Sequence, residues 1–202
     1  MNEINYDKEI EIAIKAAKSA GNFLNEDKNN LNLKIKSNPK DTKLMADIKS
    51  EKLILDILNS ESNYPVLAEE TGKSSENLGE IFWVVDPLDG TANYNRNIPI
   101  CCVSIGLVKN MKPLIGVIFD FNNDDIFIGD NINKLARLNN KKIMVSDIHN
   151  RSEGVLITGL PFNTDYSDNA LKKLISDMQT WKKVRMIGSA AMASCYVASG
   201  KA

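Results

Sequence analysis

Two aspartates near the middle of the chain are spaced as a pair that could do chemistry. Asp86 follows an apolar run of β-forming residues, and Asp89 comes three positions later, with Gly90 and Thr91 directly behind it. Pro87 biases Asp86 away from helix and Gly90 permits a tight turn, so the two carboxylates can converge on one point. Converging carboxylates repel each other unless a proton or a cation lies between them. A hard cation with oxygen ligands, Mg²⁺ above all, is therefore one prediction for this stretch.

The same stretch has a second interpretation as plain turn chemistry. Aspartates in a D-P-x-D-G sequence accept hydrogen bonds from their own backbone, and glycine takes a positive φ. A further acidic pair, Glu69-Glu70, follows another short apolar segment and favours the cation. Acidic pairs are nevertheless common on solvated surfaces, so these residues alone leave both interpretations open.

The elements that must position these residues form a mixture of helices and strands. Amphipathic spacing predicts helices at 3–26 and 167–180, and a further helix that starts near Asp47. Alternating or apolar runs predict strands at 31–37, 81–85, 101–108, 114–120, 125–130, 154–160 and 184–187, with a short one beginning at 66. The strands between 101 and 130 are expected to be successive antiparallel neighbours. This order predicts an α+β layered fold rather than strict βαβ alternation.

Composition bounds the function classes. The 202 residues suffice for a sizeable core, and 25 basic against 26 acidic residues leave a net charge of −1. Nucleic-acid binding is not expected, because no basic excess exists to neutralise phosphates. No signal peptide or membrane-length apolar run is present, and the three cysteines show neither disulfide nor metal-ligand spacing. We therefore expect a soluble, cytoplasmic protein without a membrane partner.

Four segments together resemble the inositol monophosphatase family of Mg²⁺-dependent, lithium-sensitive phosphatases. They are AEE, WVVDPLDGTANY, IPICCVSIGLV and VRMIGSAAMASCYVASGKA, and the resemblance runs from the first predicted helix to the last residue. It implies a layered α/β sandwich of the inositol monophosphatase and fructose-1,6-bisphosphatase type. The family continues with a Trp-Asp motif that carries a third metal-binding aspartate. The resemblance therefore implies one domain over residues 1–202 that lacks its C-terminal segment.

The resemblance also implies a set of metal ligands. Glu69, Asp86 and the backbone carbonyl of Leu88 would surround a first Mg²⁺, Asp86 would bridge to a second, and Asp89 would bind that second ion. Two or three Mg²⁺ ions are expected in all, with Li⁺ as an inhibitor.

Catalytic roles follow in the same way. Thr91, together with Glu69, would orient and deprotonate the attacking water. Asp47 would support the threonine through a hydrogen bond, although the residue also suits a helix N-cap, and the two roles are compatible.

Substrate contacts are implied at two glycine-containing segments. Backbone N–H groups of Gly90 and Thr91 would meet phosphate oxygens. The second segment would also contact substrate, although its small residues equally suit close helix packing; it comprises Gly188, Ser189 and Ala190. Lys36 corresponds to a loop position near the metals, and a solvated lysine is the alternative there.

The implied activity is hydrolysis of a small phosphorylated polyol, with inositol 1-phosphate first. Histidinol phosphate, fructose 1,6-bisphosphate and a 3′,5′-bisphosphate nucleotide are alternative substrates. A non-catalytic, truncated family member is the alternative of a different class. Homodimerisation is usual in the family and is expected here only on that ground.

Overall fold

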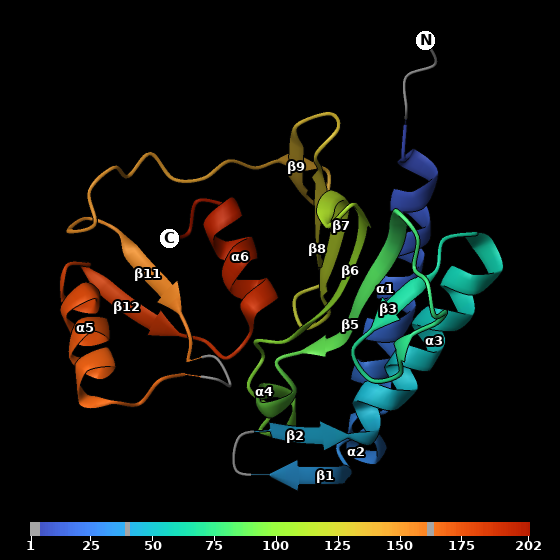
Figure 1. The fold of residues 1–202 in the computed structure, drawn as a ribbon, viewed down its shortest axis with the longest axis horizontal. Coiled ribbons are helices and arrows are strands. Elements are labelled where there is room, and N and C mark those ends of the chain that lie inside the picture. Colours follow the sequence, from blue (N-terminus) through green and yellow to red (C-terminus); the bar gives the residue numbers. More distant parts are fainter. Residues whose placement is uncertain (1–4, 39–40, 161–163) are drawn as a thin grey trace.

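The computed structural model describes residues 5–38, 41–160 and 164–202, and the side chains of all of these except 36–38 and 41–42. Helices α1 (Asp7–Glu26) and α3 (Met45–Glu61) cover one face of a large sheet, and α6 (Ala190–Ala198) lies on the other face (Figure 1). Beyond α6 lie two further strands and α5 (Asp168–Gln179). This succession of helix and sheet layers confirms the α+β layered prediction.

The large sheet has eight strands in the order β10-β9-β8-β7-β6-β5-β3-β4. Neighbours from β5 through β10 are antiparallel, as expected of a meander, and β3 alone pairs in parallel with β5. The strand bounds are β3 Val66–Ala68, β4 Gly72–Lys73, β5 Ile81–Asp89, β6 Cys102–Lys109, β7 Lys112–Asp120, β8 Asp125–Asp130, β9 Leu135–Leu138 and β10 Lys141–Lys142.

The hydrophobic core lies between this sheet and helices α1 and α3. Alternate residues of β6, namely Val103, Ile105 and Leu107, are at most 1% exposed and belong to the same cluster as the small side chains of α1. Full burial of such side chains contributes roughly 1.5–3 kcal/mol each. Gly21 lets α1 approach the sheet closely, because a Cβ there would lie 2.5 Å from the ring of Phe119.

Strand β5 corrects one sequence prediction, because it does not end at residue 85. It continues through both aspartates to Asp89. Asp86 lies opposite Ser104 of β6 and Asp89 lies opposite Cys102, so the two residues between the aspartates face a single partner position. This bulge adds one residue to the strand and puts both aspartates on one face of the sheet. In a regular strand, residues three apart point to opposite faces.

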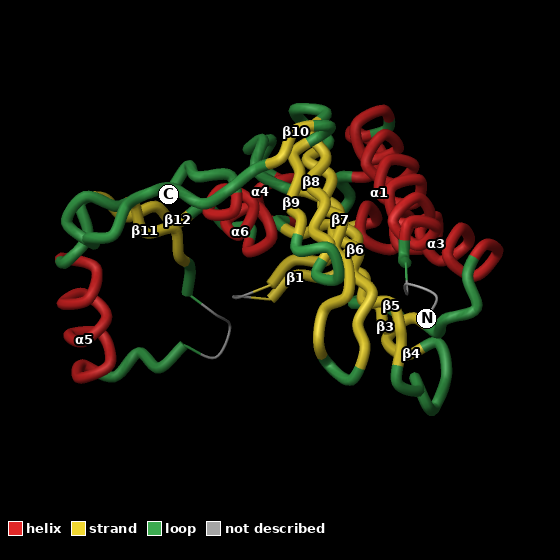
Figure 2. Tube along the Cα trace, turned by 90° about the horizontal axis from the view of Figure 1, so that it is seen from above, coloured by secondary structure: helices red, strands yellow, loops and turns green. Residues whose placement is uncertain are grey.

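The remaining elements are smaller. A hairpin of β1 (Lys34–Asn38) and β2 (Asp41–Leu44) leads into α3, after the short helix α2 (Lys28–Leu31). Helix α4 (Thr91–Asn95) follows β5 directly. Strands β11 (Val155–Thr158) and β12 (Lys183–Met186) pair in parallel and lie, with α5, on the far side of α6 from the large sheet (Figures 1 and 2). Among the described helices, none is long and apolar enough to cross a membrane.

Candidate active site

The acidic pair lies in a tight hairpin turn at the edge of the sheet. Strands β3 and β4 pair from Ala68 to Gly72, which leaves Glu69, Glu70 and Thr71 as a three-residue loop. Gly72 closes the loop with a φ of 78°, a conformation that favours glycine. The Glu69 N–H donates to the carbonyl of Val85 at 3.1 Å, so the turn is fixed to β5 just before Asp86.

The two members of the pair differ in their surroundings. Glu69 is exposed to solvent and hydrogen-bonds to Asp86, whereas the Glu70 carboxylate forms an ion pair with Lys43 of β2. Glu69 is thus the member that faces the aspartates of β5, which is the residue expected from the sequence.

Asp86 is held in an environment that disfavours its charge. One carboxylate oxygen, Oδ1, accepts the N–H of Leu88 at 3.0 Å, a local bond of the kind that the turn interpretation expects. Burial, followed by the negative charges of Glu69 and Asp89, raises the pKa of Asp86 to about 8. Carboxylates this close together are stabilised by a proton or by a cation between them.

Asp89 forms hydrogen bonds with the N-terminus of α6 across 100 to 102 positions of sequence. Its Oδ2 accepts the Ser189 hydroxyl at 2.5 Å and the Ala191 N–H at 2.6 Å, and its Oδ1 accepts the Ala190 N–H at 3.3 Å. Ser189 in turn caps α6 by accepting the Met192 N–H at 3.2 Å. A carboxylate at a helix N-terminus is stabilised by the helix dipole as well as by these donors.

Thr91 and Asp47 form the contact that the resemblance implies. The Thr91 hydroxyl lies 3.0 Å from Asp47 Oδ1 and 3.1 Å from the carbonyl of Leu88. Asp47 is the third residue of α3 rather than its N-cap, and its Oδ2 accepts the N–H of Leu44, the capping position, at 2.7 Å. Burial raises the pKa of Asp47 to about 6, although these two donors oppose the shift.

The position between Asp89 and Thr91 requires a glycine, Gly90. Its φ is 97°, and a Cβ there would lie 2.8 Å from the carbonyl oxygen of Ile100. The following helix, α4, begins at Thr91, so the glycine turns the chain from the strand that carries the aspartates into the helix that carries the threonine.

The substrate segment predicted at residues 188–190 also lies at this site. Gly188 adopts a φ of 73° and precedes the N-cap of α6. Sequence reasoning missed Asn93, whose side-chain amide donates to the carbonyls of Ile100 and Ile187, each at 2.7 Å. Asn93 thereby joins α4 to the residue before Gly188; its place two residues after Thr91 was the available signal. The Lys36 side chain lies outside the described residues.

The donor set fits a hard cation, although it is not preformed as a cage. Among the described residues, no group of three or more His, Cys, Asp and Glu side chains is arranged to hold a metal ion. The reason lies in the contacts above, since Oδ2 of Asp89 is taken by α6 and Asp86 hydrogen-bonds to Glu69. The chemistry still fits, because three neighbouring carboxylates and the Leu88 carbonyl are oxygen donors, and their mutual repulsion favours a cation.

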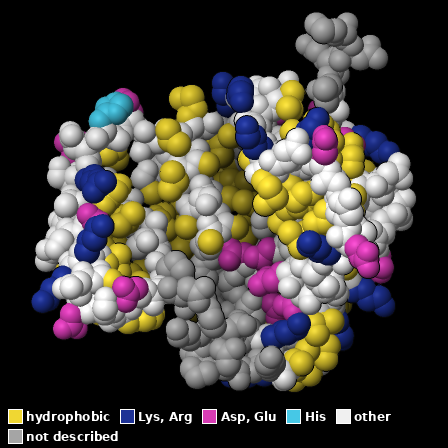
Figure 3. Space-filling model, in the orientation of Figure 1, with side chains coloured by type: hydrophobic (Ala, Val, Ile, Leu, Met, Phe, Trp, Pro, Cys, Tyr) yellow, Lys and Arg dark blue, Asp and Glu magenta, His cyan; other side chains and the backbone are white. Residues whose placement is uncertain are grey.

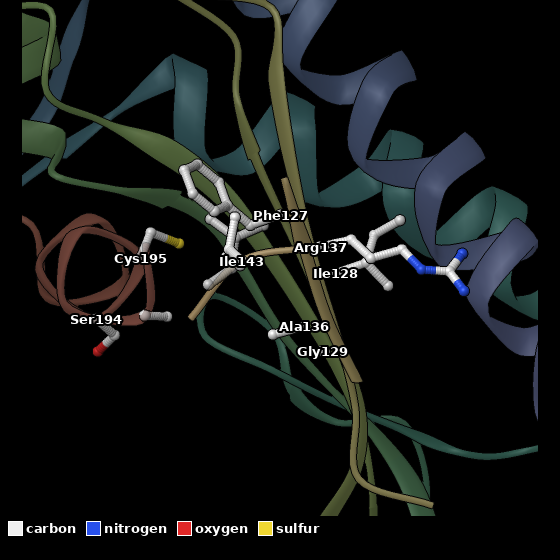
Figure 4. Close-up of a pocket in the computed structure, with 11 residues that line it drawn as sticks. Phe127, Ile128, Gly129, Ala136, Arg137, Ile143, Ser194 and Cys195 are labelled. Atoms are coloured by element: carbon white, nitrogen blue, oxygen red, sulfur yellow. The ribbon is translucent and has the colours of Figure 1, made fainter. Parts of the chain in front are cut away.

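The surface supports this location. Acidic side chains gather in the middle of the face shown in Figure 3, where β5 ends in Figure 1, below a hollow lined by hydrophobic side chains. A separate cavity of about 200 Å³ lies between α6 and the sheet (Figure 4). Its lining includes Phe127, Ala136, Ile143 and Cys195, and none of the predicted site residues. The acidic centre, and not this cavity, is therefore the candidate active site.

Comparison with known proteins agrees with this geometry. Residues 5–202 match the inositol monophosphatase family. The chain belongs to the inositol monophosphatase family. Membership makes it a phosphoric monoester hydrolase of that type, as the resemblance implied.

Relatives of this inositol monophosphatase family member carry two kinds of name. Nus factor SuhB of Xylella fastidiosa is 36% identical over 197 residues, which cover 96% of this chain and 70% of the relative. Inositol monophosphatase 1 of Rattus norvegicus is 30% identical over 203 residues, covering 96% and 72%. The inositol monophosphatase structure from Anabaena has a TM-score of 0.84 at 34% identity, covering 98% of this chain and 73% of that one. The chain thus spans about seven tenths of the length of these relatives.

Proposed function

We propose that this chain hydrolyses a small phosphate monoester with Mg²⁺, and that myo-inositol 1-phosphate is its first substrate. The observation that carries the proposal is the convergence of Glu69, Asp86 and Asp89 beside a threonine whose hydroxyl is held by a buried aspartate. Glu69, Asp86, Asp89 and the Leu88 carbonyl would hold two or three ions. A dication bound there would lower the pKa of its bound water and neutralise charge on phosphate oxygens.

The residues of the chain supply the orientation and proton handling. Thr91 donates its only proton within its two contacts, to Asp47 or to the Leu88 carbonyl, which leaves its oxygen lone pairs to accept a hydrogen bond from the attacking water. Glu69, exposed at the same site, takes the proton as the water oxygen bonds to phosphorus. The bond from phosphorus to the ester oxygen breaks, and the alcohol leaves after gaining a proton from solvent.

Substrate contacts are proposed on both sides of the acidic centre. Backbone N–H groups at Gly90 and Thr91 would meet phosphate oxygens, and the segment Gly188, Ser189 and Ala190 would face the alcohol. Support comes from the hydrogen bonds of Asp89 and Asn93, which hold this segment beside α4. Lithium inhibition, one domain over residues 1–202 and a homodimer stay predictions from the family, and a cytoplasmic location stays a prediction from the composition.

The testing experiment is phosphate release with and without Mg²⁺ for this chain and for Asp86→Asn. The substrates are inositol 1-phosphate, histidinol phosphate, fructose 1,6-bisphosphate and adenosine 3′,5′-bisphosphate. We expect Mg²⁺-dependent release, fastest with inositol 1-phosphate, that Asp86→Asn abolishes and Li⁺ suppresses. A different preferred substrate would overturn the inositol assignment alone. Silence from a folded chain would favour the non-catalytic alternative.

A further inference from the structure

A second buried carboxylate on α3 lies one helical turn after Asp47. Glu51 is only 1% exposed and Asp47 only 2%. Residues four apart on a helix lie on the same face, about 6 Å apart along the axis. Burying a carboxylate is costly unless hydrogen bonds compensate, so the partners of Glu51 indicate its role.

Those partners are the backbone of the acidic turn. Glu51 Oε2 accepts the N–H of Glu70 at 2.7 Å, and Oε1 accepts the N–H of Thr71 at 2.9 Å. Both donors belong to the three-residue loop between β3 and β4, immediately after Glu69. Two charge-assisted bonds to successive N–H groups fix the orientation of that peptide segment as well as its position.

Asp47 makes the corresponding contact with the other side of the site. Its Oδ1 accepts the Thr91 hydroxyl, and its backbone belongs to the same rigid helix. One turn of α3 therefore sets the separation between the anchor of Thr91 and the anchor of the Glu69 turn. These are the two residues that the proposed function assigns to the attacking water.

We propose that Glu51 is a positioning residue that fixes Glu69 toward Asp86 and the cation site. This inference rests on the proposed function, since it concerns the same site. The bond from Glu69 N–H to the Val85 carbonyl holds the start of the turn, and Glu51 holds its remainder. Without the Glu51 carboxylate, the turn keeps its attachment to β5 but loses the bonds that orient the peptides after Glu69.

The test compares Glu51→Gln with Ser50→Ala. Glutamine keeps the shape of the side chain but has one acceptor oxygen instead of two. Its amide NH₂ group would therefore face the N–H of Glu70 or Thr71, which it cannot accept. Ser50 is a matched control, because it is buried beside Glu51 on α3 and its hydroxyl bonds only to the carbonyls of Ala46 and Asp47 among its described partners. Glu51→Asp keeps two carboxylate oxygens and serves as the conservative variant.

Two readouts are measured on the whole chain: Mn²⁺ affinity by electron paramagnetic resonance, and the Mg²⁺ dependence of phosphate release. We expect Glu51→Gln to weaken Mn²⁺ binding about 10- to 100-fold, as loss of an outer hydrogen-bond partner does. The Mg²⁺ requirement should rise in parallel, with little change in KM for the substrate. Ser50→Ala should bind Mn²⁺ like the parent, and Glu51→Asp should lie between the parent and Glu51→Gln.

The outcomes separate the two proposals. Unchanged Mn²⁺ affinity in folded Glu51→Gln, or an equal loss in Ser50→Ala, overturns the positioning role. A parent chain that binds Mn²⁺ without releasing phosphate overturns the proposed function, while the affinities still decide the role of Glu51. A parent chain that binds no Mn²⁺ overturns both.

Discussion

Side chains are buried more completely on the sheet side of the molecule than on the side that carries β11, β12 and α5. On the sheet side, Trp83, Val103 and Leu107 are fully buried, and α1 and α3 press onto the same cluster. On the other side, the described residues from 143 to 188 include only one buried residue, Gly154, and α5 has none. Two parallel strands and one helix without a common core contribute little stability of their own.

The residues proposed to bind the metal ions and orient the attacking water lie on the more deeply buried side. Every predicted metal ligand, and both residues of the Thr91–Asp47 contact, lie on the well-packed side. Among the described residues, the other side reaches the site through the segment around Gly188, which leads into the N-terminus of α6. Groups that must be held in a fixed geometry thus sit on rigid elements, whereas the proposed contacts to the alcohol come from the less buried side.

The largest effect is expected from removal of the Thr91 hydroxyl on the sheet side, compared with removal of a hydroxyl on α6. Thr91→Ala should lower kcat about 10²- to 10⁴-fold, because the threonine orients the water. Thr91→Ser should keep most activity. Ser194→Ala, which removes an exposed hydroxyl of α6 bonded to the Ala190 carbonyl, should change kcat by less than about twofold. Steady-state phosphate release measures kcat for all three variants. Equal losses of kcat in Thr91→Ala and Ser194→Ala would contradict the expected difference.

The chain's two tryptophans test the burial difference directly. Trp83 is 0% exposed and its indole donates to the Ser62 hydroxyl at 3.0 Å, so Trp83→Ala should cost about 3–5 kcal/mol of unfolding free energy. Trp181 is partly exposed, and the centroid of its ring lies 5.5 Å from Cζ of Arg151. Trp181→Ala should therefore cost about 1 kcal/mol of unfolding free energy.

Urea unfolding followed by circular dichroism measures both costs. In each variant, the fluorescence of the remaining tryptophan reports one side of the molecule alone. If Trp83→Ala does not fold, Trp83→Phe and Trp181→Phe form the matched pair. Similar costs at the two positions would show that the second side is as well packed as the first.

Stability of the sheet side should depend on pH when divalent ions are absent. Folding raises the pKa of Asp47 to about 6 and that of Asp86 to about 8, so the folded chain binds these protons more tightly than the unfolded chain. The resulting stability is fully present below about pH 4 and is lost as pH rises through 6 and then 8, on the order of a few kcal/mol in total.

Denaturant unfolding at several pH values measures this loss. Asp86→Asn should remove the loss between pH 6 and 8 and part of the loss between pH 4 and 6, and added Mg²⁺ should oppose the loss in the parent. A free energy of unfolding that rises steadily from pH 5 to 8 would contradict the assignment.

The smallest effects concern two helix caps. Ser189 is 5% exposed, accepts the Met192 N–H and donates to Asp89, so Ser189→Ala should cost about 1–2 kcal/mol. Ser167 caps α5 through the Ala170 N–H at 3.4 Å in an exposed position, so Ser167→Ala should cost about 0.5 kcal/mol. Thermal unfolding compares the pair, and a larger cost at Ser167 would reverse the expected order.

Sequence predicted the sheet side well because its signals are local. The apolar run before Asp86, the strands between 101 and 130 and the helix near Asp47 follow from periodicity, with bounds that shift by a few residues. The helix expected from residue 3 begins at Asp7 in the structure, and residues 1–4 lie outside the described part. The predicted end of β5 was wrong, because a bulge depends on how β6 pairs with the strand and not on the sequence of β5 alone.

Contacts between distant segments could not be predicted from spacing. Nothing in the sequence near Asp89 indicates that it meets Ser189 and Ala191 a hundred residues later. Glu51 offered a weak signal, since it lies four residues after Asp47 on a predicted helix, but its backbone partners depend on the tertiary fold. Resemblance to a family pointed to the site, whereas the hydrogen bonds that hold it required the structure.

The extra residue in β5 makes the pairing with β6 at that point as important as the aspartates themselves. If β5 paired regularly with β6 beyond Asp86, Asp89 would lie opposite Cys101, a buried residue of the core under α1 and α3. The carboxylate would face hydrocarbon instead of the acidic centre. One residue inserted into β6 between Cys102 and Ser104 would pair the extra residue of β5 and could therefore silence the enzyme while every aspartate remained in the sequence, a loss that a search for catalytic residue types would not detect.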